Sequence, residues 1–216
     1  MNSNISSPWD DEYNGSQIGP IYEPLWTMLQ VFLHNLSIKT VLDFGCGDGK
    51  YSFLIGESGL NVIGIDNSVR AIEKATSYKQ DHKDDRCRFL CNNHIPINLP
   101  NESIDAVIML NSYHCLTNKE RSNILNQVNR VLKKNGCLFV SVLAIDDESY
   151  PRNEWKEIDV NTFDNGKGKI FHFFSPNELS MELKGFEILD NRMLQNIHPE
   201  TGRKSALYVI TARSKK

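Results

Sequence analysis

The segment from Val41 to Lys50, VLDFGCGDGK, limits the possible folds of this chain more than any other feature. A short apolar run leads directly into three closely spaced glycines, Gly45, Gly47 and Gly49. Glycine adopts backbone conformations that other residues resist, and it lets a ligand approach the main chain closely. The helix that should follow offers free N–H groups at its first turn. The segment therefore predicts a strand, a ligand-binding turn and a helix in direct succession.

The rest of the chain repeats this strand-then-helix pattern. Apolar or β-branched runs occur at residues 40–44, 61–65, 88–91, 106–110 and 137–143, with helical patterns between them. Such alternation predicts parallel strands joined by crossover helices. The last two runs, at 186–189 and 207–212, have no helix between them and should pair antiparallel. We therefore expect a doubly wound α/β fold, with a mostly parallel seven-stranded sheet that ends in a C-terminal antiparallel hairpin.

Two capping patterns predict where helices begin. Thr117-Asn118-Lys119-Glu120 is a capping box, in which the hydroxyl and the carboxylate each satisfy a backbone N–H. The apolar stripe that follows extends to Leu132, and Asn135-Gly136 supplies a stop signal. Ser175-Pro176-Asn177-Glu178 is a second box, with Ser175 as its N-cap, and Gly185 should end that helix.

A chain of 216 residues predicts one domain. Two segments lie outside the repeating pattern. Residues 1–37 contain an amphipathic stretch near 24–33 and are interpreted as an N-terminal helical lid on the main domain, 38–216. The polar stretch 146–174 is interpreted as an insertion toward the substrate site, because long additions to compact domains often form binding loops.

Composition excludes several classes of function. The 24 basic and 27 acidic residues give a net charge of −3, so nucleic acid is not an expected partner. No apolar run approaches the roughly 20 residues that cross a bilayer, and the polar start of the chain does not resemble a secretory signal. Five scattered cysteines predict reduced thiols, no metal site and a cytoplasmic location.

The acidic residues near the glycine turn distinguish between cofactors. A dinucleotide fingerprint, G-x-G-x-x-G, would need glycine at position 50, where this chain has Lys50. Asp43 would also place a carboxylate beside the pyrophosphate of a dinucleotide. S-adenosylmethionine instead carries an ammonium and a sulfonium and has no phosphate. Asp66, at the end of the second predicted strand, could accept both hydroxyls of a ribose.

Across residues 38–145 the chain resembles the class I S-adenosylmethionine-dependent methyltransferase family, through DFGCGDG at 43–49 and GIDNS at 64–68. The resemblance implies S-adenosylmethionine as the cofactor. Ile104-Asp105 is similar to the family's Phe-Asp pair, and counting back from it places Asn93 and His94 at the adenine. Asn111 would lie near the methionine portion. The implied cofactor-binding residues are Asp43, Gly45, Cys46, Gly47, Asp66, Asn67, Asn93, His94 and Asn111.

The type of acceptor is suggested by two other segments. IFHFF at 170–174 resembles a segment of small-molecule methyltransferases, including the tellurite-resistance-like group. NSYH at 111–114 lacks the Asp/Asn-Pro-Pro-Tyr/Phe signature of enzymes that methylate DNA bases or glutamine. We therefore expect methyl transfer to a small-molecule acceptor by direct displacement. A non-catalytic cofactor-binding or interaction protein of the same fold is the alternative, and the sequence leaves the oligomeric state open.

Two groups of side chains could act around the reacting atoms. His114 follows the fourth strand at the carboxyl edge of the sheet, where an imidazole could accept a proton from the acceptor. Trp9, Tyr13 and Tyr22 precede the first strand and could close over a sulfonium through their π faces. They could equally be packing residues.

Overall fold

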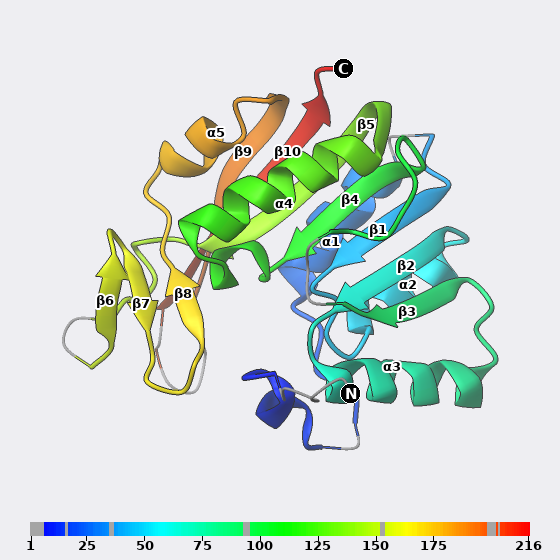
Figure 1. Ribbon diagram of the computed structural model, residues 1–216, viewed down its shortest axis with the longest axis horizontal. Coiled ribbons are helices and arrows are strands. Elements are labelled where there is room, and N and C mark those ends of the chain that lie inside the picture. Colours follow the sequence, from blue (N-terminus) through cyan, green and yellow to red (C-terminus); the bar gives the residue numbers. More distant parts are fainter. Residues whose placement is uncertain are drawn as a thin grey trace.

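The computed structural model describes residues 7–15, 17–34, 37–92, 96–151, 154–197, 202 and 204–216. The strands of its main sheet are β1 (Thr40–Phe44), β2 (Asn61–Asp66), β3 (Cys87–Cys91), β4 (Ile104–Leu110), β5 (Leu132–Leu143), β9 (Phe186–Ile197) and β10 (Lys204–Ser214). Their order across the sheet is β3-β2-β1-β4-β5-β10-β9 (Figure 1). The first five strands pair in parallel, and β10 lies antiparallel to both β5 and β9. The predicted fold class is confirmed.

Helices cover both faces of this sheet. They are α1 (Glu23–His34), α2 (Lys50–Glu57), α3 (Val69–His82), α4 (Asn118–Val131) and α5 (Glu178–Glu182), with single 3-10 turns at η1 (Asp10–Tyr13) and η2 (Tyr113–Cys115). Leu29 of α1 and Ile55 of α2 are fully buried with Phe139 against one face. Ile124 of α4 belongs to the core on the opposite face. Helix α1 coincides with the predicted N-terminal amphipathic helix.

Helix α4 begins as predicted and ends earlier than predicted. Thr117 N donates to Glu120 Oε2 at 2.8 Å, and Glu120 N donates to the Thr117 hydroxyl, so the capping box is formed. The predicted stop at Asn135-Gly136 is wrong, because Leu132 already adopts an extended backbone (φ −61°, ψ 138°) and pairs with Ile104 in the sheet. Because a buried leucine fits a strand as well as the apolar face of a helix, the sequence pattern did not show where the helix ends.

Helix α5 differs from its prediction in a similar way. Ser175 N donates to the Glu178 carboxylate at 3.2 Å, which forms one half of the predicted box. The helix itself starts at Glu178, with Asn177 as the N-cap, and ends at Glu182, ahead of Gly185. Leu179 is the one buried residue among its five, and the next buried apolar residue, Leu183, already lies at the C-cap.

The insertion is a small antiparallel sheet, which the sequence did not predict. Its strands are β6 (Lys156–Asp159), β7 (Thr162–Asp164) and β8 (Ile170–His172), in the order β6-β7-β8 (Figure 1). The rings of Phe163 and Phe173 pack edge to face on Tyr150, at centroid distances of 5.3 and 5.2 Å. Strands of three or four residues are too short to show an alternating pattern.

From β1 the chain continues to β2, toward one edge of the sheet, and from β4 it continues to β5, toward the other edge. The strand order therefore reverses between β1 and β4. Ligands of open α/β sheets bind at the carboxyl ends of the strands on either side of such a point. The glycine turn follows β1, and Asn111 follows β4. None of the described helices has the length and apolar content needed to cross a lipid bilayer.

Candidate cofactor-binding site

A cavity of about 700 Å³ opens at the carboxyl ends of β1, β2 and β4. Its lining brings together seven of the residues predicted from sequence: Asp43, Gly45, Cys46, Gly47, Asp66, Asn67 and Asn111. The two predicted adenine contacts, Asn93 and His94, lie outside the described residues. Segments far apart in the chain therefore converge on one site.

Gly45 allows β1 to turn sharply into this cavity. Its φ of +74° lies in the region that favours glycine, and its N–H donates to the Ile65 carbonyl at 2.8 Å. A β-carbon on Gly45 would lie 2.3 Å from the Ser112 β-carbon. Ser112 is held there because its hydroxyl donates to the Phe44 carbonyl at 2.6 Å. The turn after β1 and the turn after β4 can approach this closely only because position 45 has no side chain.

Asp66 is fixed at the floor of the cavity by backbone donors. Gly47 N donates to its Oδ2 at 2.8 Å, and Ser68 N donates to its Oδ1 at 2.9 Å. The residue is 7% exposed. A carboxylate offers about four acceptor positions, so these two bonds are compatible with further bonds from ligand hydroxyls.

Asp43 is a more deeply buried carboxyl group at the end of β1. Its Oδ2 accepts a hydrogen bond from the Ser52 hydroxyl at 2.6 Å. Burial raises the pKa of Asp43 to about 7; the Ser52 bond lowers it in part, and the charge of Asp66 raises it further. The carboxyl group therefore changes charge near neutral pH.

Asn111 closes the opposite side of the cavity. It has a φ of +54°, and its N–H donates to the Ser141 carbonyl at 3.1 Å. The Ser141 hydroxyl donates to Asn111 Oδ1 at 3.1 Å, which orients the amide. Asparagine tolerates the left-handed region better than most residues, so it can end β4 in this way.

The N-terminal segment forms a roof over the cavity. Trp9, Tyr13 and Tyr22 all contribute to the lining, as their possible role as a cover suggested. The Tyr13 hydroxyl lies 2.5 Å from the position that a β-carbon on Gly47 would take. Burial raises the pKa of Tyr13, and the charge of Asp66 raises it further, so the hydroxyl stays protonated.

Contacts on two sides hold this roof in place. Asp10 of η1 accepts a hydrogen bond from the Ser68 hydroxyl at 2.6 Å, at the start of α3. On the other side, Glu12 forms an ion pair with Lys169, and Trp9 packs edge to face on Phe171 at a centroid distance of 5.6 Å. Sequence reasoning missed Asp10 and Lys169, because no local pattern marks a contact across 58 or 157 residues.

His114 lies outside the described lining of the cavity. It is 4% exposed, and its Nδ1 accepts a hydrogen bond from Leu143 N at 3.4 Å. Burial lowers the pKa of His114 to about 3, and the neighbouring His172 contributes to the shift. In the neutral ring Nε2 then carries the proton, so neither nitrogen is a ready acceptor. The geometry does not favour the predicted base, which stays a prediction.

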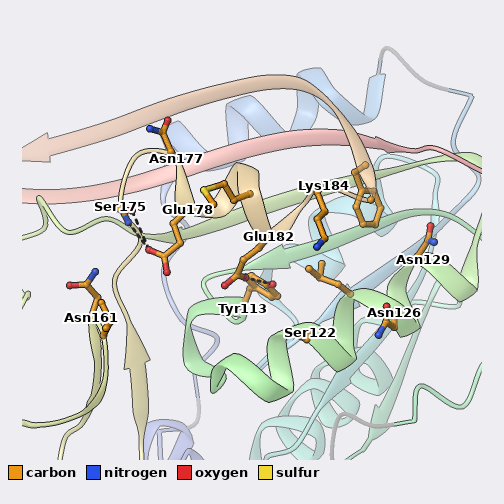
Figure 2. Close-up of a pocket in the computed structure, with 15 residues that line it drawn as sticks. Tyr113, Ser122, Asn126, Asn129, Asn161, Ser175, Asn177, Glu178, Glu182 and Lys184 are labelled. Carbon is orange, nitrogen blue, oxygen red and sulfur yellow. Dashed lines mark hydrogen bonds between the residues drawn. The ribbon is translucent and has the colours of Figure 1, made fainter.

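A second and larger cavity, about 850 Å³, lies between α4, α5 and the small sheet. Figure 2 shows Tyr113 and Glu182 facing each other there, with a hydrogen bond of 2.5 Å between their side chains. Glu182 also forms an ion pair with Arg121 at 3.0 Å, and Glu178 accepts from Ser175. None of the predicted cofactor residues that the structure describes lines this cavity. The predicted cofactor residues that the structure describes line the first cavity instead.

Comparison with known proteins identifies the family. Residues 41–136 match the family described as Methyltransferase domain. A solved S-adenosylmethionine-dependent methyltransferase from Methanosarcina mazei is 26% identical and has a TM-score of 0.72, over 85% of this chain and 96% of that one. Residues 41–136 therefore form a methyltransferase domain, and the chain has the fold of class I S-adenosylmethionine-dependent methyltransferases. The cofactor of this methyltransferase family is S-adenosylmethionine, which confirms the cofactor prediction.

Other methyltransferases with related sequences or folds act on different acceptors. The tRNA N(3)-cytidine methyltransferase METTL2 of Gallus gallus is 24% identical over 186 residues, which cover 81% of this chain and 50% of that protein. The present chain thus spans about half the length of this relative. The 1,6-didemethyltoxoflavin-N1-methyltransferase of Burkholderia thailandensis was solved with 1,6-didemethyltoxoflavin and S-adenosylhomocysteine bound. It shares the fold at 19% identity and a TM-score of 0.68, over 89% of this chain and 77% of that one.

Proposed function

We propose that this methyltransferase moves a methyl group from S-adenosylmethionine to a small-molecule acceptor by direct displacement. The observation that carries the proposal is the cavity, in which the glycine turn, Asp66 and Asn111 lie beneath a roof made by η1 and the insertion. Its volume of about 700 Å³ falls within the range of pockets that enclose small ligands.

The described residues are suited to hold this cofactor. Gly45 and Gly47 expose the main chain, Asp66 would accept hydrogen bonds from the ribose hydroxyls, and Asp43 would face the ammonium group. When bound, S-adenosylmethionine supplies a methyl group on a sulfonium sulfur, which a nucleophile can displace. The chain's contribution is to align the acceptor and to exclude water, and Trp9 and Tyr13 in the roof are placed to do so.

The charge of the chain favours a small acceptor over tRNA. Recognition of tRNA depends on basic side chains that neutralise phosphates, and this chain carries a net charge of −3. The described lining contains carboxylates and lysines in unequal number: Glu12, Asp43, Asp48, Asp66 and Glu120 against Lys50 and Lys74. A neutral or cationic acceptor suits this lining better than a polyanion.

An acceptor screen tests the proposal. The purified protein is incubated with S-adenosylmethionine and either a panel of amines, phenols, thiols and carboxylates or total tRNA, and S-adenosylhomocysteine is measured. Turnover with a small molecule and none with tRNA would support the proposal. Turnover with tRNA alone would contradict it. Cofactor binding without turnover on any acceptor would favour the non-catalytic alternative.

Removing the imidazole of His114 should affect stability more than catalysis. In His114→Ala, Leu143 N–H loses its buried acceptor, which costs about 1–3 kcal/mol of unfolding free energy. We expect turnover on the identified acceptor to stay within about threefold of wild type, whereas loss of a general base costs about 100- to 10,000-fold. Denaturant unfolding and steady-state kinetics on the same preparation separate the two. A rate loss of that size at unchanged stability would restore His114 as the base.

Cofactor affinity should depend on pH through Asp43. With a pKa of about 7, Asp43 is mostly neutral near pH 6 and mostly ionised near pH 8, and the ionised form attracts an ammonium group. We expect affinity for S-adenosylmethionine to rise by up to about tenfold across this interval. Calorimetry at several pH values measures it, and Asp43→Asn, which should remove the rise, corrects for titration of the cofactor. If cofactor affinity rose equally with pH in both proteins, the assignment of the pH dependence to Asp43 would be contradicted.

The same group gives the opposite trend for stability in the absence of ligand. The folded-state pKa of Asp43 lies above its unfolded value, so the folded protein binds more protons between about pH 4 and 7. The contribution of Asp43 to the stability of the folded protein is therefore present at low pH and is lost as the pH rises to about 7. The Tm of wild type should therefore fall relative to the Tm of Asp43→Asn as the pH rises across this range.

A further inference from the structure

Lys50 is the first residue of α2 and lines the cofactor cavity. The other lysine of the described lining, Lys74, forms an ion pair with Asp48 at 3.5 Å. Lys50 forms no ion pair with any carboxylate that the structure describes. Its Nζ instead lies 5.7 Å from the centroid of the Tyr51 ring. Its ammonium group is thus available to a ligand in the cavity.

A neighbouring carboxylate, that of Asp48, is already engaged by other donors. Lys50 Nζ and Asp48 Oδ2 each lie 3.5 Å from the point that a β-carbon on Gly19 would occupy. Asp48 Oδ2 accepts a hydrogen bond from Gly19 N at 2.8 Å and also pairs with Lys74. Lys50 therefore approaches the N-terminal segment without a partner of its own, between that segment and the glycine turn.

The position of Lys50 is electrostatically unfavourable in the free protein. The amino end of a helix carries a partial positive charge, so a lysine at the first position of α2 is disfavoured. A negatively charged group bound beside Lys50 would reverse this effect, because both the ammonium group and the helix end would attract it.

The cofactor supplies such a group. S-adenosylmethionine carries a carboxylate besides its two cationic centres, and this carboxylate would be repelled by Asp43, Asp48 and Asp66 unless a cation shields it. We infer that Lys50 binds the α-carboxylate of S-adenosylmethionine, while Asp43 faces its ammonium group. This inference rests on the proposed function, and it assigns the two charged ends of the amino acid portion to two different residues.

A cycle between protein and ligand variants tests the assignment. Wild type, Lys50→Met and Lys50→Arg are titrated calorimetrically with S-adenosylmethionine and with its decarboxylated form, which lacks only the carboxylate. We expect Lys50→Met to weaken binding of the first by about 10- to 100-fold and of the second by less than about threefold. Lys50→Arg should keep most of the wild-type preference for the carboxylate, because it keeps the charge.

Each other outcome has a distinct meaning. Equal weakening of both ligands in Lys50→Met would overturn the inference and point to a role in packing the roof. Unchanged binding of both would overturn it as well. If wild type binds neither ligand, the proposed function itself fails. Thermal unfolding of Lys50→Met is the control for folding, and Lys79→Met, an α3 variant outside the described lining, is the control for a general loss of positive charge.

Discussion

Replacing Asp66 with alanine is expected to weaken S-adenosylmethionine binding by about 100-fold or more, because hydrogen bonds from two ribose hydroxyls would be lost. Each hydrogen bond from a ribose hydroxyl to the carboxylate is charge-assisted and contributes about 1.5–3 kcal/mol. The substitution also leaves Gly47 N and Ser68 N without the acceptor that now orients them. Calorimetric titration of the variant with the cofactor measures the loss directly.

Two variants separate this effect from a general change in charge. Asp66→Asn keeps one acceptor oxygen without the charge, so its affinity should lie between wild type and Asp66→Ala. Asp81→Ala removes an exposed carboxylate from α3 and should bind like wild type. Wild-type affinity in Asp66→Ala would remove this residue from the ribose site and leave the glycine turn as the main support for the cofactor assignment.

Gly45→Ala should be among the most destabilising single substitutions in the chain. The new methyl group would have to adopt a φ of +74°, and it would lie 2.3 Å from the Ser112 β-carbon. The positive φ costs an alanine about 1–2 kcal/mol, and the close contact with Ser112 costs about 1–3 kcal/mol as overpacking. We expect the free energy of unfolding to fall by about 2–5 kcal/mol, as measured by denaturant titration.

Gly59 provides a matched control, because its φ of +91° is also positive and nothing lies within 4 Å of the β-carbon position. Gly59→Ala should therefore show the conformational cost alone, about 1–2 kcal/mol. Adding Ser112→Gly to Gly45→Ala should recover part of the loss, because it removes the atom in the closest contact. Equal losses in Gly45→Ala and Gly59→Ala would contradict the close approach of the two turns.

Local sequence patterns predicted the parts of the fold that local chemistry determines. The first four strands, the glycine turn and the Thr117 capping box were found where the sequence placed them, and β5 contains the predicted run 137–143 but begins earlier. The early end of α4 was missed, because Leu132 is apolar enough for either a helix stripe or a strand. Its pairing with Ile104, 28 residues earlier, decides between them.

The roof and the direction of side chains depend on contacts that sequence patterns do not contain. The bond between Asp10 and Ser68 and the ion pair between Glu12 and Lys169 join segments whose proximity follows only from the folded sheet. His114 was correctly placed after β4, but the 3-10 turn that follows directs Cys115 and Ser112 to the cavity and His114 to the core. Position along the chain predicted the neighbourhood, and backbone geometry decided which side chains line the cavity.

The most direct test of the account is isothermal titration calorimetry of the unmodified protein with S-adenosylmethionine and, in a separate experiment, with NADH. Saturable binding of S-adenosylmethionine, with no binding of NADH, is the predicted result, because Asp43 and the glycine spacing suit a cationic ligand without phosphate. Binding of NADH alone would contradict the account, since it would show that the glycine turn accepts a pyrophosphate beside Asp43.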